Sequence, residues 1–279
     1  MAKLRIITAM LIFGTIGIFV DRLPYPSAFI ALFRSLCGLL VLLIFALLFR
    51  KRISLGCIFS NILMLLPAGA FLGLNWVFLF EAYRYTSISF ATLCYYMAPI
   101  FVIILAPLFL KKPTGVVKKA CAVVAAAGMI LLTGVQSFGD PRGLMFGLGA
   151  ALLYALIILL TAVTKNISPL EITVSELFIS SLVLIPYVLN KYDIASFTFD
   201  KESVVILLIL GIIHTGVAYL LYFGGMKRVS PHTAAVYSYI DPVFAIVLSC
   251  IISHTFLSLP EMVGAVMILG AAFVSDTKK

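Results

Sequence analysis

Ten long hydrophobic runs constrain the fold of this 279-residue chain more than any other feature of its sequence. The runs lie near residues 4–20, 27–49, 61–83, 87–110, 116–135, 143–164, 169–189, 203–225, 231–252 and 260–275. A helix of about 20 apolar residues crosses a hydrocarbon core about 30 Å thick, and the runs are close to that length. Only 11% of the residues are charged, and little but short loops remains between the runs. The sequence therefore predicts an all-α polytopic membrane protein with ten transmembrane helices and no soluble domain.

The two halves of the chain repeat one another. Residues 71–104 align with residues 214–247 at a constant offset of 143 positions, without a gap. Eight of the 34 positions are identical, and they include the pairs Tyr96 and Tyr239, and Pro99 and Pro242. Each half holds five hydrophobic runs, so the second half starts from the opposite side of the membrane. We therefore expect two inverted five-helix repeats, residues 1–137 and 138–279, an arrangement that suits alternating access to a site at the bilayer midplane.

The net charge of +9 reflects membrane topology. With ten spans both termini lie on the same side, and the segments on that side hold 14 of the 20 Lys and Arg residues. The loops on the opposite side hold 5, and Arg34 within the second run completes the count. The positive-inside rule then predicts that both termini are cytoplasmic and that the chain lies in the cell membrane. We expect the lipid bilayer and a small-molecule substrate as partners, and no nucleic acid.

The sequence contains no motif of an enzyme or of a metal site. Neither H-E-x-x-H nor G-x-S-x-G occurs, and the five cysteines show no C-x-x-C spacing. A membrane-embedded enzyme would need a nucleophile with its base, or a cluster of metal ligands. We therefore predict that the chain is not an enzyme and that it uses no cofactor or metal.

Glycine, proline, tyrosine and a few polar residues occur in a characteristic order along the hydrophobic runs. Gly14 lies in the first run and Arg34 lies early in the second. A Tyr-Thr-Ser-Ile-Ser turn occupies residues 85–89, and the fourth and ninth runs share a Tyr-x-x-Pro pattern that begins at Tyr96 and Tyr239. Glycine and alanine are concentrated in the fifth and tenth runs. Over essentially the whole chain, this order resembles the EamA-type family of the drug/metabolite transporter superfamily.

The resemblance implies a ten-helix transporter. Helices one to four and six to nine would surround a central cavity, and helices five and ten would pack at the periphery. The small-residue faces of helices five and ten allow close contact, either within one chain or between the two protomers of a homodimer. Family members often carry a glutamate just after the fourth and ninth helices, where this chain has Lys111 and His254. The role of that glutamate is therefore not transferred to this chain.

Four ionisable residues lie within the hydrophobic runs, namely Arg34, Glu176, His214 and Asp241. Charged residues at such depth cost about 2.5–3.5 kcal/mol each on insertion scales, so they usually face the interior of a helix bundle. Arg34 and Glu176 occupy nearly repeat-equivalent positions, and inversion places them near opposite faces of the membrane. We predict that each lines a vestibule or anchors a gate; the alternative is a structural bond to loop backbone. Glu81, three residues before Arg84, is expected to form a surface ion pair.

Asp241 precedes Pro242 near the middle of the ninth run. Proline removes a backbone donor and kinks a helix, which leaves polar groups in need of partners. We predict that the Asp241 carboxyl binds a substrate amine or carries a coupling proton; the alternative is a neutral acid that hydrogen-bonds between helices. Tyr237 lies on the same helical face, whereas Tyr239 lies roughly 200° round the helix. The repeat-equivalent Pro99 and Pro242 are predicted to act as hinges.

His214 and Tyr222 are expected to form one wall of the cavity, because residues eight apart share a face of an α-helix. Their repeat equivalents lie on one face of the third run, where Asn75 is the polar member. Trp76 is a neighbouring aromatic residue. For His214 the alternative is a buried structural histidine.

These features together predict a secondary transporter that moves a small organic solute, an amino acid or a related metabolite, by alternating access. A tyrosine-rich lining with few charges suits an amphipathic solute better than a polyphosphate. The alternatives are an exporter of lipophilic cations or toxic analogues, and a channel or structural protein. The predicted substrate-binding residues are Asp241, Tyr237, Tyr239, His214, Tyr222, Asn75, Trp76 and Tyr96. The predicted gating or coupling residues are Arg34, Glu176, Pro99 and Pro242.

Overall fold

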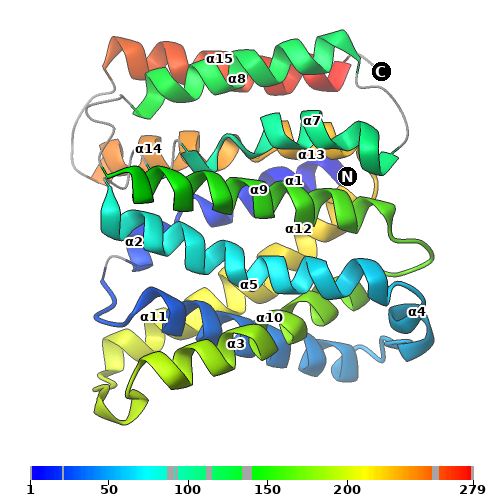
Figure 1. Cartoon of the computed structure of the whole chain (residues 1–279), viewed down its shortest axis with the longest axis vertical. Helices are drawn as coiled ribbons and strands as arrows, with labels where there is room; N and C mark the ends of the chain where they lie inside the picture. Colours follow the sequence, from blue (N-terminus) through cyan, green and yellow to red (C-terminus); the bar gives the residue numbers. More distant parts are fainter. Residues whose placement is uncertain are drawn as a thin grey trace.

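The computed structural model describes residues 2–20, 22–86, 91, 94–110, 115–133, 140–252 and 258–277. Within these ranges the chain is helical and contains no β-strand (Figure 1). Six helical segments there are long and apolar enough to cross a membrane, and shorter apolar helices accompany them. The predicted all-α polytopic fold is confirmed at this level. Lys111, His254 and residues 87–89 of the predicted turn lie outside the described residues.

Each of the ten hydrophobic runs contains at least one helix. The first half of the chain holds α1 (Ala2–Phe13), α2 (Ile16–Val20), α3 (Ser27–Leu48), α4 (Leu55–Ser60), α5 (Ile62–Tyr85), α7 (Ala98–Leu110) and α8 (Val116–Thr133). The second half begins with α9 (Pro141–Val163), α10 (Pro169–Lys191), the 3₁₀ turn η1 (Ile194–Ser196), α11 (Lys201–Gly211) and the π-helical segment η2 (Ile212–Val217). It ends with α12 (Ala218–Met226), α13 (Pro231–Tyr237), α14 (Ile240–Ile252) and α15 (Leu259–Thr277).

Local signals in the sequence set where several helices begin. α10 starts with a capping box, in which the Ser168 hydroxyl accepts from the Glu171 N–H at 3.2 Å and Glu171 Oε2 accepts from the Ser168 N–H at 2.8 Å. Glu171 Oε1 also accepts from the Ser54 N–H at 2.7 Å, which ties the α3–α4 connection to α10. In α9, Pro141 follows the N-cap Asp140, a position where the missing proline N–H has no consequence.

Several apolar runs are interrupted in the middle. Turns at Tyr96–Met97 and Ser238–Tyr239 precede α7 and α14, and a third turn at Gly14–Thr15 separates α1 from α2. Pro99 and Pro242 lie in the first turns of α7 and α14. Proline is tolerated there because its missing N–H would have no intrahelical acceptor. Matched breaks in the two halves thus coincide with the shared Tyr-x-x-Pro pattern.

The helices are stacked in layers along the long axis of the molecule (Figure 1). α8 and α15 lie side by side at one end of this stack, and α3, α10 and α11 lie at the other end. A Cβ atom added to Gly128 of α8 would lie only 2.8 Å from the Gly264 carbonyl oxygen of α15. The close contact that small residues permit is therefore made within one chain, and the fifth and tenth hydrophobic runs pack at the periphery.

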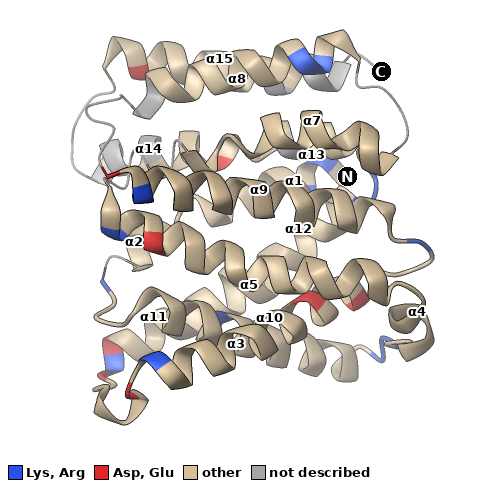
Figure 2. Cartoon of the chain, viewed as in Figure 1, with Lys and Arg blue, Asp and Glu red and all other residues tan. Residues whose placement is uncertain are grey.

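The outer surface of the molecule is apolar. Charged side chains lie mostly near helix ends and in connections, and few lie inside the bundle (Figure 2). Large hydrophobic side chains are exposed along the helices, among them Leu63 at 82%, Leu47 at 78% and Phe273 at 70%. Contiguous apolar surface of this kind aggregates in water and is solvated by acyl chains. The surface therefore fits a lipid bilayer.

Candidate functional site

Five tyrosines, here called the tyrosine cluster, meet inside the bundle. They are Tyr95 and Tyr96 before α7, Tyr154 of α9, and Tyr219 and Tyr222 of α12. The Tyr154 hydroxyl donates to the Tyr222 hydroxyl at 2.9 Å, and the Tyr95 and Tyr154 rings stack with centroids 5.5 Å apart. Phe13 of α1 contacts the rings of both Tyr219 and Tyr222. Tyr95, Tyr154 and Tyr219 are partly exposed, so open space adjoins the cluster.

Asp241 lies beside the tyrosine cluster, in the first turn of α14. The Tyr96 hydroxyl donates a hydrogen bond to its carboxylate, and Tyr95 and Tyr219 lie within electrostatic range of it. Its side chain is partly exposed. The N-terminus of a helix carries a partial positive charge, which favours a carboxylate at this position. Asp241 is therefore an acidic group that borders open space and is oriented by one tyrosine.

Arg34 of α3 is 2% exposed, and Tyr219 and Tyr95 both lie within its electrostatic range. Its Nε donates to Thr215 Oγ1 at 3.1 Å. The guanidinium carbon lies 4.9 Å from the centroid of the Trp76 ring, in cation–π geometry. Within the described part of the chain, no ion pair joins Arg34 to an acidic side chain.

Glu176 of α10 is fully buried. Thr161 Oγ1 of α9 donates to Glu176 Oε1 at 2.8 Å, whereas Glu176 Oε2 has no hydrogen-bond partner among the described residues. Tyr219 and Tyr222 lie within electrostatic range of this carboxyl. Glu176 therefore belongs to the same polar region as Arg34 and Asp241, at a distance from the Arg34 guanidinium that excludes a direct ion pair.

The π-helical segment η2 changes the direction of two polar side chains. Thr215 Oγ1 donates to the Leu210 carbonyl at 2.8 Å, and His214 Nδ1 lies 3.3 Å from the Ile209 carbonyl oxygen. His214 Nε2 lies 2.7 Å from Thr15 Oγ1, at the break between α1 and α2. The Thr15 hydroxyl donates to the Ile12 carbonyl at 2.7 Å, so each of the two His214 ring nitrogens has a polar neighbour and the tautomer sets which one donates. His214 is thus held against the first helices, while Tyr222 reaches Tyr154 of α9.

Asn75 and Trp76 of α5 position other groups of the site. Asn75 Nδ2 donates to the Ala150 carbonyl of α9 at 2.7 Å, and the Asn75 side chain also hydrogen-bonds Tyr95. Trp76 lies under Arg34, and its indole hydrogen-bonds the Tyr219 hydroxyl. Both side chains are almost fully buried. Asn75 and Trp76 therefore hold the tyrosine rings and the buried guanidinium in place.

Tyr237 is the last residue of α13, and Tyr239 lies in the turn before α14. Tyr237 is 7% exposed and packs in the main hydrophobic core. Tyr239 is fully buried, and its ring centroid lies 6.0 Å from that of Tyr96. Its neighbours include residues of α8 and α15, such as Met129 and Ile268. Tyr239 therefore faces the peripheral helix pair, whereas Asp241 faces the tyrosine cluster.

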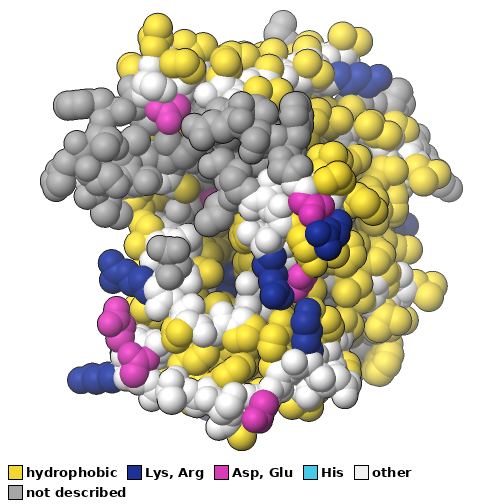
Figure 3. All heavy atoms as spheres, turned by 60° about the vertical axis from the view of Figure 1, so that its left-hand side comes forward, with side chains coloured by type: hydrophobic (Ala, Val, Ile, Leu, Met, Phe, Trp, Pro, Cys, Tyr) yellow, Lys and Arg dark blue, Asp and Glu magenta, His cyan; other side chains and the backbone are white. Residues whose placement is uncertain are grey.

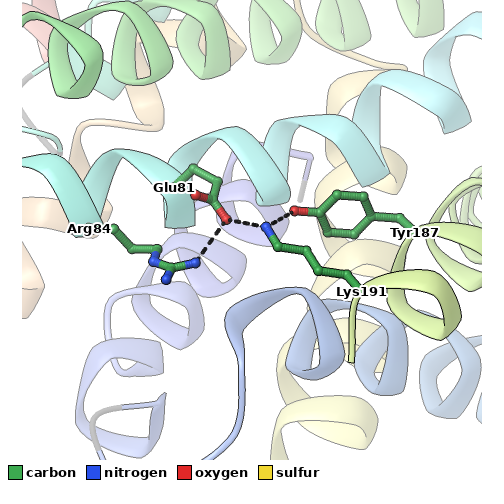
Figure 4. Close-up of polar contacts among 4 residues, drawn as sticks. All are labelled: Glu81, Arg84, Tyr187 and Lys191. Carbon is green, nitrogen blue, oxygen red and sulfur yellow. Dashed lines mark hydrogen bonds and ion pairs between the residues drawn. The ribbon is translucent and has the colours of Figure 1, made fainter. Parts of the chain in front are cut away.

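A polar network joins α5 and α10 at one end of the bundle, as Figure 4 shows. Glu81 Oε1 lies 3.5 Å from an Arg84 nitrogen and 3.4 Å from Lys191 Nζ, and Lys191 Nζ donates to the Tyr187 hydroxyl at 2.7 Å. The predicted pair of Glu81 and Arg84 is confirmed, and it extends to α10. Figure 3 shows that the surface at this end is hollowed and that charged side chains stand around the hollow.

Different polar contacts tie the opposite ends of the helices together. Lys227 Nζ donates to the Thr164 carbonyl at 2.6 Å and to its hydroxyl at 2.8 Å, and burial lowers the pKa of the Lys227 ammonium. Asn61 exchanges two hydrogen bonds of 2.9 Å with the backbone of Lys165. These bonds join α12 and α5 to the end of α9, where they draw the helix ends together.

The polar residues at the centre suit noncovalent recognition. Arg34 supplies a positive group, and Asp241 and Glu176 supply acidic groups that do not form ion pairs with it. Within the described residues, no group of three or more His, Cys, Asp or Glu side chains is arranged to hold a metal ion. Aromatic rings with a few placed polar groups and adjoining open space are typical of sites for small organic molecules.

Sequence reasoning missed Tyr95 and Tyr154. Tyr95 stands next to Tyr96 in the repeated pattern, but α-helical geometry directs adjacent residues apart, and the turn at Tyr96–Met97 brings them together. Tyr154 lies outside the repeated segments, so no sequence signal distinguished it from other apolar positions of its run. Thr161, which binds Glu176, was missed for the same reason. Thr215, which binds Arg34, lies inside a repeated segment but is matched there by the apolar Leu72, so the repeat did not single it out.

A bundle of long apolar helices with an interior polar cluster and a lipid-compatible surface defines a multi-pass membrane protein. The family model for the EamA-like transporter family matches residues 1–134 and again residues 141–275. The chain therefore belongs to this family, and it is a membrane transporter of the cell membrane.

Two relatives agree with this assignment, and one solved structure is similar in fold. An uncharacterized transporter, YxxF, of Bacillus subtilis (strain 168) is 29% identical over 272 residues, which cover 96% of this chain and 86% of that protein. An uncharacterized transporter of Archaeoglobus fulgidus is 25% identical over 273 residues, which cover 97% of this chain and 94% of that protein. A crystal structure of a protein at 17% identity superposes with a TM-score of 0.86 and covers 99% of this chain and 97% of that one. The solved structure shares the fold.

Proposed function

We propose that the chain is a secondary transporter with ten transmembrane helices in two inverted five-helix repeats, residues 1–137 and 138–279, and with both termini cytoplasmic. The constant offset of 143 positions supports the repeats, and the matched breaks before Pro99 and Pro242 support them independently. The family model also matches two successive segments of the chain. Broken helices at the interface of inverted repeats are typical of carriers that work by alternating access.

The substrate we propose is a small amphipathic organic solute, an amino acid or a related metabolite. The observation that carries this proposal is the tyrosine cluster, in which Tyr95, Tyr154 and Tyr219 are partly exposed, with Asp241 at its edge. Ring faces provide apolar contact, and hydroxyl and carboxyl groups orient the polar part of a solute. In this proposal Asp241, Tyr96 and Tyr222 contact the substrate, and Asn75 and Trp76 position the groups that do.

The proposed motion uses the two broken helices. Pro99 and Pro242 act as hinges, because a half-helix that starts at a break can tilt without losing intrahelical hydrogen bonds. Asp241 binds a substrate amine or carries a coupling proton as the hinge moves. The contacts of Lys227 with Thr164 hold the helix ends on one side together and must open in the alternate state.

An exporter of lipophilic cations is the second candidate. An acidic group among aromatic rings favours a cation, since ring faces and a carboxylate both attract positive charge. Arg34 favours the first candidate, because a buried guanidinium within electrostatic range of the same tyrosines repels a cationic solute.

Flux across a reconstituted membrane tests both candidates. The purified chain is placed in liposomes, and entry of labelled amino acids and of labelled lipophilic cations is measured with and without a pH gradient. Saturable counterflow of an amino acid supports the proposal, and counterflow restricted to cations supports the alternative. Ion conductance without saturable counterflow would show that the chain is a channel.

A further inference from the structure

The buried guanidinium of Arg34 has an incomplete set of partners. Guanidinium has five N–H donors, and in the described part of the chain it makes one hydrogen bond, from Nε to Thr215 Oγ1. The Trp76 ring covers one face of the group at 4.9 Å. A buried charge is costly unless an opposite charge and hydrogen bonds compensate it, and the ring and one hydroxyl compensate only in part.

The two acidic residues that share a tyrosine neighbour with Arg34 do not supply the missing charge. Glu176 and Asp241 both lie within electrostatic range of Tyr219, as Arg34 does, yet neither forms an ion pair with Arg34. Glu176 is bonded to Thr161, and Asp241 is bonded to Tyr96. The opposite charges therefore stand apart, and Tyr95 and Tyr219 lie within electrostatic range of both Arg34 and Asp241.

We propose that Arg34 is the anion subsite of the transporter and that the substrates are monocarboxylates, in which the carboxylate pairs with the free N–H groups of Arg34. This inference rests on the proposed function and narrows its substrate class. The fork of guanidinium N–H groups matches the two oxygens of a carboxylate, and such charge-assisted pairs are the strong ones. Arg34 is the one cation that the described residues place at the cluster, so a singly charged anion is matched and a polyphosphate is not.

Contacts around Thr215 and Trp76 restrain the guanidinium. Thr215 is fixed by its own bond to the Leu210 carbonyl in the π-helical segment, and a Cβ on Gly38 would lie 2.7 Å from the Thr215 side chain. Trp76 is held by its bond to Tyr219. The N–H groups of the guanidinium are thus held in place before the anion arrives, so less conformational entropy is lost when the anion binds.

Trp76 is the only tryptophan of the chain, so its fluorescence reports directly on the proposed subsite. The purified protein is titrated with leucine, with N-acetyl-leucine and with leucinamide, which share a side chain and differ in charge. The same series is repeated with phenylalanine and its two derivatives. We expect saturable fluorescence changes with the free acids and the N-acetyl acids in at least one series, and none with the amides.

Three variants test the role of the guanidinium. Arg34→Gln is expected to weaken the response to acids by about tenfold or more, and Arg34→Lys to weaken it less because the charge remains while the fork is lost. Arg142→Gln is the matched control, because Arg142 also stacks on an aromatic ring, Tyr85 at 4.5 Å, but is exposed and paired with Asp140. It should bind the acids as the unmodified chain does.

The outcomes separate this inference from the proposed function. Equal responses to acids and amides, or no response in either series, would overturn the anion subsite, and this contrast needs only the unmodified chain. Counterflow that does not discriminate acid from amide would leave the transporter proposal standing without the subsite. Binding of acids through Arg34 without counterflow would leave the subsite standing without transport.

Discussion

Asp241 lies in the first turn of a helix in the interior of an apolar bundle, where Tyr96 hydrogen-bonds its carboxylate and Tyr95 and Tyr219 lie within electrostatic range. A carboxylate gains there from the helix N-terminus, and a carboxylic acid gains from the low polarity of the site. The balance between the two forms therefore depends on whether the site is open to water. This dependence is what a proton-coupled step requires.

Asp241→Asn is expected to abolish accumulation driven by a pH gradient while exchange of substrate continues, because the amide keeps the shape of the neutral acid and cannot release a proton. Asp241→Ala should also weaken binding of an amine substrate by about tenfold or more. Uptake and exchange in liposomes at several pH values measure both effects. Glu202→Gln is the control, since Glu202 is an exposed acid in the first turn of α11. An Asn variant with unchanged uptake at every pH would reduce Asp241 to a structural group.

Sequence reasoning found the buried charges but not the directions of their side chains. Hydropathy makes Arg34, Glu176 and Asp241 conspicuous, because each interrupts an apolar run. The shared wall of His214 and Tyr222 rested on α-helical spacing, and the π-helical segment Ile212–Val217 changes that spacing. Hydropathy does not indicate whether a backbone carbonyl accepts from the N–H four residues ahead, as in an α-helix, or five residues ahead, as in a π-helix. The partners of His214 could therefore not be predicted from the hydropathy pattern.

At the scale of helices, the breaks in apolar runs decide what lies at the centre. The break between α1 and α2 contacts the start of α14, because a Cβ on Gly14 would lie 2.8 Å from the Asp241 carbonyl oxygen and 3.0 Å from the Phe244 ring. Two interruptions from different halves of the chain thus meet at Asp241. A small residue is needed there because backbone stands against backbone.

Gly14→Ala is expected to lower stability by about 1–3 kcal/mol and to slow transport, since the new methyl group must displace the start of α14. Gly17→Ala is a matched control in the same run, because nothing lies within 4 Å of a Cβ at that position. The control should keep transport and gain slightly in stability, as alanine favours a helix. Thermal unfolding in detergent and counterflow measure the two effects. If both variants unfold at the same temperature and transport at the same rate, the contact between Gly14 and α14 does not limit stability or transport.

The prolines give the second prediction at this scale. Pro99→Ala and Pro242→Ala should each slow counterflow by about tenfold, the effect of about 1.4 kcal/mol on the barrier, while the protein stays folded. Alanine has an N–H and allows a helix to continue through the break, which stiffens the element that must bend. Pro141→Ala is the control, because Pro141 begins the unbroken helix α9. Full transport by both variants would mean that the prolines are merely tolerated.

The approximate positions of the helices could be predicted from the sequence. Of the interruptions within the apolar runs, only those near a proline could. A run of apolar residues is recognisable from composition, and a helix is the structure that satisfies its backbone in lipid. The turns at Gly14–Thr15 and Ser238–Tyr239 lie within such runs and contain no charged residue. Proline signalled the second turn, but glycine is too common in membrane helices to signal the first. The short helix α4 (Leu55–Ser60) was also missed, because it lies in a segment taken as loop.

At the scale of the whole molecule, the two ends of the bundle carry different polar networks. Glu81 and Lys191 join two helices at the hollowed end, and Lys227 and Asn61 bond helix ends at the other. Sequence reasoning placed the basic residues on one side by counting, and could not foresee these bonds because they join residues more than 60 positions apart. An alternating-access cycle requires that one network opens while the other closes.

The side of the membrane to which each end belongs follows from the basic residues and can be measured. Lys51 lies just after the end of α3. Lys201 is the first residue of α11, three residues after Thr198. The Thr198 carbonyl accepts a hydrogen bond from the Tyr25 hydroxyl, just before the start of α3. The two lysines therefore lie at opposite ends of α3, about 33 Å apart along a 22-residue helix. Fourteen basic residues against five predict that the Lys51 end is cytoplasmic. In a variant without the native cysteines, Lys51→Cys and Lys278→Cys should be protected from an impermeant thiol reagent in intact cells, and Lys201→Cys should react. Labelling of position 51 or 278 from outside would invert the proposed topology.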